Sequence, residues 1–321
     1  MLQLDQELLR ALDDTAVLQE LIPLLRSNSV RLKRERAQLR IDGPDIAYHG
    51  NDPYLQVGLD LLGIGGDLAS RQGFRQHGEL FDLCLEDSWC GLFLSEFASD
   101  LDQDAPLNLI HLDDHTDMMS TLLVAGAPLH DPLTQRAFDP ANPSHWPSAI
   151  FSGAVGIGSF LTPFFAMQRP VSVFHVQAGR GALACFAVKE RPIGHPLLGD
   201  ARFYAVHCEP MLPGGAAANR YLRGEDPAQV LGNLPPGTLA VHVDLDYFIN
   251  DFNGNFDHSR TREAGGLQAR ARQRLDSVFD ALAPYGAQIE RWMVATSPGF
   301  CSGRHWGFLL SELRDRITQL A

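Results

Sequence analysis

The chain has little cysteine and almost no lysine. Its five cysteines are Cys84, Cys90, Cys185, Cys208 and Cys301. They form no CxxC pair, and their odd number does not suit a disulfide framework, so we expect a reduced, cytosolic protein in which they take no part in the chemistry. The only lysines are Lys33 and Lys189. A Schiff-base cofactor therefore has few candidate sites, and a phosphate-binding loop with its lysine is excluded.

Long apolar runs and an excess of basic charge are also missing. Runs such as "VSVFHV" and "ALACFAV" are too short to cross a bilayer, and the N-terminal "MLQLDQELLRALDD" is acidic where a secretory signal would be basic. The formal net charge of -13 argues against nucleic acid and favours a cationic small molecule or a basic peptide as partner. The basic stretch "RLKRERAQLR" at 31–40 is an exception, which we interpret as a solvated helix face or a connector.

A length of 321 residues with 45% hydrophobic content is enough to bury a large core. Leucines recur every three or four residues from Leu2 to Leu25, which predicts an amphipathic helix, and "DPYLQVGLDLLGIGG" predicts a second one. We expect residues 1–78 to form an N-terminal helical extension packed on the core, and residues 79–321 to form the catalytic domain.

After residue 78, short apolar runs alternate with helical patterns. Strands are expected near 81–85, 107–112, 171–177, 182–188, 202–207, 239–243 and 289–295, and the clearest helix at 265–282. This alternation predicts an α/β fold of three α/β/α layers with a mostly parallel sheet. The closely spaced strands of 171–207 predict a hairpin or an addition at the sheet edge.

Two of the expected strands end in acids, in "LIHLDDHTD" at 109–117 and "AVHVDLDYFINDFNG" at 240–254. Asp113, His115 and Asp117 share one parity. Asp244 and Asp246 share another, so each set points to one side while the chain stays extended. If the two strands are neighbours, the five side chains converge. Otherwise each cluster is a helix N-cap with surface acids.

Converging carboxylates are tolerable only around concentrated positive charge, and two divalent metal ions are the usual arrangement. Oxygen-rich ligands with one imidazole favour Mn²⁺, with Fe²⁺ or Co²⁺ as substitutes, over Zn²⁺. We expect Asp113 and Asp244 to bridge two ions. His115 and Asp246 would bind one ion and Asp117 the other. Such a pair lowers the pKa of water toward neutrality, so no serine or cysteine nucleophile is needed.

At these residues the sequence resembles the ureohydrolase (arginase) superfamily, whose members carry Asp-x-His-x-Asp and Asp-x-Asp strand ends around two manganese ions. The segments "HLDDHTDM", "VGIGSFLTPFF", "HVDLDYF" and "VATSPGF" are similar to the arginase-like branch that contains the peptide arginases. That branch converts arginine side chains of ribosomally made peptides to ornithine. The resemblance covers about residues 80–300 and implies an arginase-like catalytic domain with two Mn²⁺ per chain.

The resemblance also implies roles outside the two motifs. His130 lies seventeen positions after Asp113, where arginases keep a histidine thought to move protons; the alternative is a loop histidine with no role. Ser88 stands where an upstream metal-binding histidine is expected, so either the first metal is held more loosely, or Glu86, Asp87 or another histidine such as His77 supplies that contact.

The acid that pairs with the guanidinium in true arginases is missing from "VATSPGF", and its replacement would be Glu86, Asp87 or Asp114. Met119 and Gly126 stand where free-arginine enzymes hold the amino acid's own carboxylate and amine, which argues for an arginine presented on a peptide.

Three further histidines have weaker assignments. His111 and His242 each precede an aspartate by two positions within an apolar strand, so they are expected to orient the bridging carboxylates rather than to bind metal. His305, after the last strand, would either touch substrate or cap a helix.

The expected activity is hydrolysis of the guanidino group of arginine side chains to ornithine and urea. The expected partner is an arginine-containing precursor peptide, with no nucleic acid and no membrane, and a homo-oligomer is compatible with the sequence. The alternatives are a zinc-dependent deacylase of the deacetylase type and a non-catalytic binding protein that keeps the arginase-like scaffold.

Overall fold

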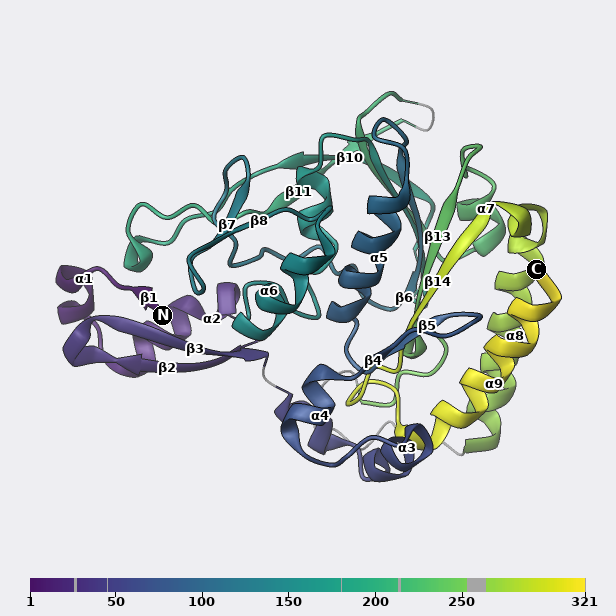
Figure 1. The fold of residues 1–321 in the computed structure, drawn as a ribbon, viewed down its shortest axis with the longest axis horizontal. Helices are drawn as coiled ribbons and strands as arrows, with labels where there is room; N and C mark the ends of the chain where they lie inside the picture. Colours follow the sequence, from purple (N-terminus) through teal and green to yellow (C-terminus); the bar gives the residue numbers. More distant parts are fainter. Residues whose placement is uncertain (26–27, 45, 180, 213–214, 253–263, 321) are drawn as a thin grey trace.

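The structure is a computed structural model, which describes residues 1–25, 28–44, 46–179, 181–212, 215–252 and 264–320. Within this part of the chain, a nine-stranded sheet runs through the molecule in the order β11-β10-β12-β9-β6-β13-β14-β5-β4 (Figure 1). In chain order its strands are β4 (Arg75–Gln76), β5 (Asp82–Cys84), β6 (Leu107–Asp113), β9 (Val171–Gln177), β10 (Ala184–Glu190), β11 (Val206–Met211), β12 (Asn219–Gly224), β13 (Leu239–Asp244) and β14 (Ile289–Ala295).

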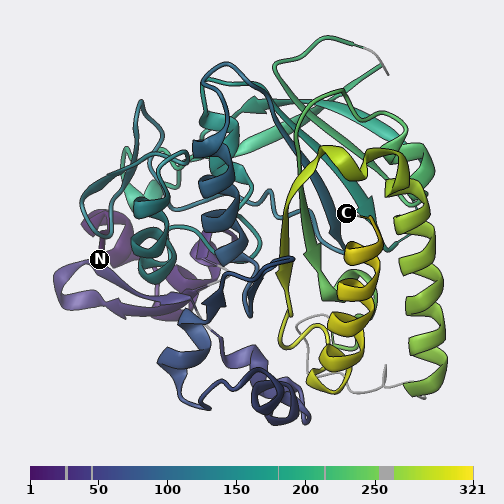
Figure 2. The same cartoon turned by 45° about the vertical axis from the view of Figure 1, so that its right-hand side comes forward.

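Helices cover both faces of this sheet, so the expected three-layer α/β/α fold is confirmed. The layers contain α3 (Leu55–Leu62), α4 (Leu68–Gly73), α5 (Ser88–Asp100), α6 (Trp146–Ser152), α7 (Pro227–Leu231), α8 (Ala264–Leu282) and α9 (Gly303–Leu320). Figure 2 shows α8 and α9 side by side on one face, with α5 on the other. No helix among the described residues is long and apolar enough to span a membrane.

The six strands in the middle of the sheet are parallel, and the antiparallel strands lie at its edges. The two strands that end in acids, β6 and β13, are direct neighbours, with His111 opposite His242. Because parallel strands end at the same edge of a sheet, their acidic ends meet there.

Alternation along β6 assigns each side chain to one of two hydrophobic cores. Leu107 and Leu109 lie in the core that also contains Phe93 of α5. Ile110 and Leu112 lie in the core formed with α8 and α9. His111 and Asp113 have the parity of Leu109, so they project toward the α5 side.

Helix α8 confirms the helix expected at 265–282, and an apolar stripe along it packs into the core. Ala271, Leu275, Val278 and Leu282 are all fully buried. Helix α3 is confirmed as well, and it ends at Gly63, whose φ of +66° is the left-handed conformation that glycine adopts readily.

The N-terminal segment contains a small sheet that the sequence analysis did not predict. The sheet has the strand order β1-β3-β2. The elements of the segment are β1 (Leu2–Gln3), α1 (Gln6–Ala11), α2 (Asp14–Leu25), β2 (Asn28–Lys33) and β3 (Gln38–Pro44). The expected helix over Leu2–Leu25 is thus a short strand and two helices, interrupted at Leu12, which has extended backbone.

The interpretation of residues 31–40 as a helix face or a connector is wrong. They form the antiparallel hairpin β2–β3, with Arg31 opposite Arg40. Leu39 is buried and Leu32 packs partly against the core, whereas Lys33 and Arg36 are exposed and Arg34 donates hydrogen bonds to the carbonyl oxygens of Leu9 and Leu12. Apolar and basic residues that alternate in this way are typical of a strand, but the many charged residues make the alternation hard to recognise in the sequence.

Strand β12 was also missed, and it changes the topology at one edge. It lies between β9 and β10, so these two strands do not form a hairpin, whereas β10 and β11 confirm the expected edge addition. The strand expected at 202–207 begins later, as β11. Strands β7 (Leu129–Asp131) and β8 (Arg136–Phe138) form a separate hairpin.

Short 3-10 helices complete the described elements. They are η1 (Arg34–Arg36), η2 (Ala47–Asn51), η3 (Pro143–His145), η4 (Thr162–Ala166), η5 (Pro196–Leu198), η6 (Leu245–Tyr247) and η8 (Ala283–Gln288).

Candidate metal centre

All five side chains of the two acidic motifs lie at the carboxyl ends of β6 and β13. Asp113 and Asp244 are the last residues of their strands, and Asp246 follows in η6. His115 reaches across from the first motif, with its Nδ1 atom 3.0 Å from Oδ2 of Asp246. Asp117 lies in the loop after β6, and its left-handed backbone, with a φ of +50°, shows that loop conformation rather than strand alternation directs its side chain toward Asp113.

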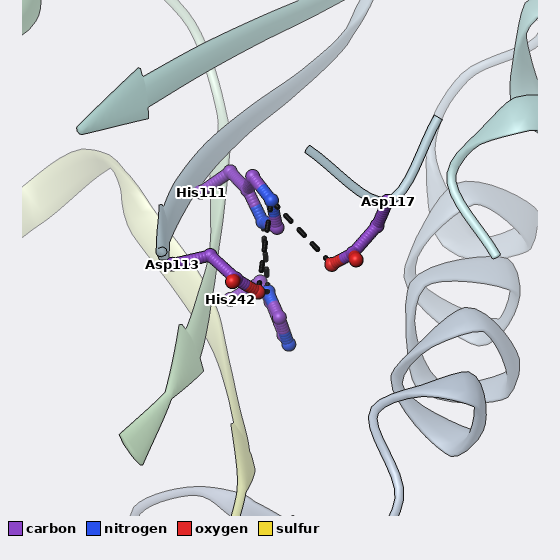
Figure 3. A group of neighbouring side chains, drawn as sticks. All are labelled: His111, Asp113, Asp117 and His242. Carbon is purple, nitrogen blue, oxygen red and sulfur yellow. Dashed lines mark hydrogen bonds and ion pairs between the residues drawn. The ribbon is translucent and has the colours of Figure 1, made fainter. Parts of the chain in front are cut away.

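Among the described residues, three groups of side chains place their ligand atoms within 4.8 Å of one another. They are His111, Asp113, Asp117 and His242; Asp113, His115 and Asp246; and Asp87, Asp113 and Asp244. Figure 3 shows the first group, with its four side chains directed toward one another. Because Asp113 belongs to all three, this buried cluster of aspartate and histidine could hold a metal ion with Asp113 at its centre.

Several carboxylate oxygens of the cluster are buried without a hydrogen-bond partner in the described structure. These atoms are Oδ1 of Asp87 and the Oδ2 atoms of Asp113, Asp117 and Asp246. A buried carboxylate oxygen without a partner is costly, and cations are the partners that carboxylates accept most readily. The donor set therefore fits a metal.

The pKa values of the acids show the same crowding. Burial, followed by the charge of neighbouring aspartates, raises the pKa of Asp87, Asp117 and Asp244 well above the usual range. Burial and the charge of Asp113 raise the pKa of Asp246 to about 6. Without a cation, several of these groups would hold protons at mildly acidic pH.

Asp113 and His115 behave in the opposite way. Burial would raise the pKa of Asp113, but the hydrogen bond with His115 and the nearby His111 and His242 lower it below the usual range. Burial would lower the pKa of His115, but its contacts with Asp113 and Asp246 raise it to about 12. In the absence of metal, His115 thus supplies the positive charge that the carboxylates require.

Ser88 stands at the position where the resemblance implies a metal-binding histidine. Ser88 opens α5, is buried, and belongs to none of the three groups among the described residues. Asp87, one residue earlier, joins Asp113 and Asp244. His77 instead has its Nδ1 atom 2.8 Å from Asp82. Of the replacements considered for Ser88, the structure brings Asp87 to the cluster.

Behind the acids, three histidines occupy the same register on neighbouring strands. His175 of β9, His111 of β6 and His242 of β13 lie side by side and are buried. His111 and His242 share a hydrogen bond of 2.8 Å between their Nδ1 atoms.

The histidine row also holds the backbone of the first motif. Nε2 of His175 lies 3.0 Å from the carbonyl oxygen of Asp113, and Nε2 of His111 lies 3.2 Å from that of His115. His111 thus contacts the backbone of the first motif, whereas the hydrogen bond of His242 is with His111; that both orient the bridging carboxylates stays a prediction, and both also belong to one potential ligand group. His175 was not predicted; its signal is a histidine inside the apolar run "VSVFHVQ".

A cavity of about 660 Å³ opens onto this cluster. It is lined by Tyr48, Leu85, Glu86, Asp87, Asp114, His115, Thr116, Asp117, Met119, Ile157, Gly158, Asp244, Ser297, Pro298 and Phe300. Sequence reasoning missed Tyr48, Ser297 and Phe300. The hydroxyl of Ser297 donates a 2.9 Å hydrogen bond to Oδ2 of Asp244, and its φ of +53° marks the "TSPGF" loop as constrained.

Other sequence-predicted residues lie outside both the cavity lining and the three ligand groups found among the described residues. His130 lies on β7, where its backbone pairs with Val124. His305 lies in the first turn of α9, with Nε2 3.4 Å from Asp251. Gly126 is exposed. Glu86, Asp87, Asp114 and Met119 all line the cavity.

No model of a known protein family matches this sequence, and no curated protein matches it.

Proposed function

We propose that this protein is a dimetal hydrolase that cleaves the guanidino group of arginine side chains, within a ribosomally made peptide, to ornithine and urea. The observation that carries the proposal is the meeting of two strand ends 131 residues apart, Asp113 and Asp244, beside the half-buried imidazole of His115 and one cavity. The resemblance to the ureohydrolase superfamily, on the same residues, supports it.

The proposed cofactor is two Mn²⁺ per chain, with Fe²⁺ or Co²⁺ as substitutes. Asp113, His115 and Asp246 would hold one ion, and Asp87, Asp113 and Asp244 the other. The unpartnered carboxylate oxygens and the excess of oxygen ligands support this assignment. Metal ions held there supply positive charge and lower the pKa of water, the nucleophile that the hydrolysis consumes.

The chain's own residues would bind and orient the substrate. An acid in the cavity that belongs to none of the three ligand groups, Glu86 or Asp114, would hold the guanidinium, which stays charged at neutral pH. Ser297 fixes the orientation of Asp244 through its hydrogen bond. The reaction adds one water to the guanidinium and gives urea and a protonated amine, so the two protons of that water must reach the leaving nitrogen through a proton donor. His130 remains the predicted donor, although it lies outside the cavity lining.

The cavity walls favour a side chain over a free amino acid. Met119, Ile157 and Phe300 present apolar surface, which suits the methylene stem of arginine and not an amino acid's charged carboxylate and amine. The acidic surface charge of the chain would attract a basic peptide.

Urea release tests the proposal. Manganese-loaded protein is incubated with arginine-containing peptides, with free arginine and with agmatine. We expect urea, together with the mass loss that separates ornithine from arginine, from a peptide and none from the Asp244→Asn variant. Absence of urea with every guanidino compound would count against the proposal.

A zinc-dependent deacylase is the second candidate, and one observation favours it. The group formed by His111, Asp113, Asp117 and His242 contains two imidazoles, and zinc prefers nitrogen ligands over oxygen. Elemental analysis separates the candidates, because the deacylase would hold one zinc and the guanidino hydrolase two manganese ions per chain.

A further inference from the structure

Glu86 is a buried carboxylate whose position is set by a distant part of the chain. It follows β5 and is only 2% exposed, yet it lines the cavity. The hydroxyl of Tyr48 donates a 2.5 Å hydrogen bond to its Oε2 atom, and Nε2 of His49 contacts its Oε1 atom. Both residues come from η2 in the N-terminal segment, so this segment contributes to the cavity.

The loop after β14 holds Tyr48 in place. Gly299 has a φ of +79°, and a Cβ atom there would lie 2.6 Å from the carbonyl oxygen of Tyr48, so the close approach requires glycine. The ring of Phe300 packs edge-on against Tyr48, with centroids 5.7 Å apart, and against His115 at 5.2 Å. One aromatic wall therefore runs from Glu86 to the metal centre.

Glu86 belongs to none of the three ligand groups found among the described residues, so metal binding does not account for its charge. Each carboxylate oxygen accepts two hydrogen bonds, and the protein contacts described here use one of them on each side. Asp87 is a member of a ligand group, and Asp114 is exposed and accepts a hydrogen bond from Asn250 at 3.1 Å.

We propose that Glu86, held by Tyr48 and His49, is the carboxylate that binds the substrate guanidinium; this inference rests on the proposed function. A planar guanidinium donates two parallel hydrogen bonds to one carboxylate and stacks well on aromatic rings. The cavity offers both, beside the metal centre. Tyr48 and His49 are positioning residues, and the ligand class is a forked planar cation rather than an ammonium ion.

Binding of non-hydrolysable cations to the manganese-loaded full chain tests this assignment by calorimetry. The probes are benzamidine, a planar forked cation, benzamide, its neutral counterpart, and benzylamine, an ammonium ion. We expect benzamidine to bind at least about tenfold more tightly than the other two, since a hydrogen bond to a charged group contributes about 1.5–3 kcal/mol. Glu86→Gln should abolish this preference and leave the manganese content unchanged.

Two further variants address the positioning role. Tyr48→Phe and His49→Gln should each weaken benzamidine binding about fivefold, with unchanged manganese content. If Glu86→Gln fails to fold, Tyr48→Phe decides, because it removes a single hydroxyl. Glu290→Gln makes the same chemical change on an exposed residue of β14 and serves as the matched control.

The inference is overturned if Glu86→Gln binds benzamidine like the wild type, if it loses manganese, if Asp114→Asn removes the preference instead, or if benzylamine binds as tightly. Glu86-dependent binding without urea release would sink the proposed hydrolysis alone. If the protein releases urea but binds benzamidine equally well with and without the Glu86 carboxylate, this inference alone is wrong.

Discussion

Asp113 is the side chain on which the proposed centre depends most, because it belongs to all three ligand groups. Asp246 belongs to one. We predict that Asp113→Asn leaves almost no bound manganese, whereas Asp246→Asn retains roughly half of the wild-type content, since one of two ions keeps its other ligands. Elemental analysis of the purified variants measures this, with Asp200→Asn as an exposed control. Full manganese content in Asp113→Asn would contradict the assignment.

At the scale of single residues, the sequence predicts those site residues whose chemistry is visible locally. Asp113 and Asp244 end apolar runs, where an acid has no structural reason to be. Tyr48 could not be predicted, because its role depends on a contact with Glu86, 38 positions away. Asp87 was one of several candidates, and only the fold brings it beside Asp113 and Asp244.

Packing between elements offers a sharper test of the fold, at the contact between α3 and α9. A Cβ atom at Gly58 of α3 would lie 2.3 Å from the ring of Trp306, which is fully buried. Gly58→Ala should therefore destabilise the protein by about 1–3 kcal/mol through overpacking, despite the better helix propensity of alanine.

The matched control is Gly307→Ala on the facing helix. Its Cβ atom would meet Leu61 at 3.4 Å, an ordinary contact. Alanine there should be neutral or stabilise by up to about 1 kcal/mol. Denaturant unfolding of both variants measures the difference, and equal stabilities would show that α3 does not pack against Trp306 as described.

An element could be predicted from the sequence where its buried residues form a clear apolar pattern. Strands β6, β9 and β13 were predicted because strands covered on both faces read as nearly continuous apolar runs. Strand β12 reads "NRYLRG", and its two arginines hide the pairing with β9 and β10. The hairpin β2–β3 was missed for the same reason.

At the scale of the whole molecule, several buried acids at one sheet edge weaken the metal-free fold. Their charge is offset only in part by His115. Anything that binds the folded state alone stabilises it. Manganese should therefore raise the melting temperature, and a chelator should reverse the effect.

The size of this manganese effect should depend on pH. The raised pKa values of Asp87, Asp117 and Asp244, and that of Asp246 at about 6, mean that the metal-free folded state holds protons that the unfolded chain has released. These acids thus make the metal-free fold less stable as pH rises from the unfolded pKa near 4 through about 6. Manganese must displace the same protons, so its apparent affinity rises over that range.

Three buried histidines work in the other direction and have to be separated from the acids. Burial lowers the pKa of His111 and His175, and that of His242 to about 4, so their contribution to stability rises with pH up to the unfolded pKa near 6.5. If they orient the ligands and do not bind metal, they are neutral with and without it. The shift in melting temperature caused by manganese then reports the proposed ligands alone, which are the acids and His115, whose pKa of about 12 means that it too must lose a proton to the metal.

We predict that this shift is larger at pH 7.5 than at pH 5, by roughly 2–4 °C for each tenfold gain in affinity. Thermal unfolding with saturating manganese and with chelator, at both pH values, measures it. Asp200→Asn, which changes an exposed acid, should show the same pH dependence as the wild type. A manganese-induced shift that is equal at the two pH values would mean that the metal does not displace protons from these buried acids, and the site would have to be placed elsewhere.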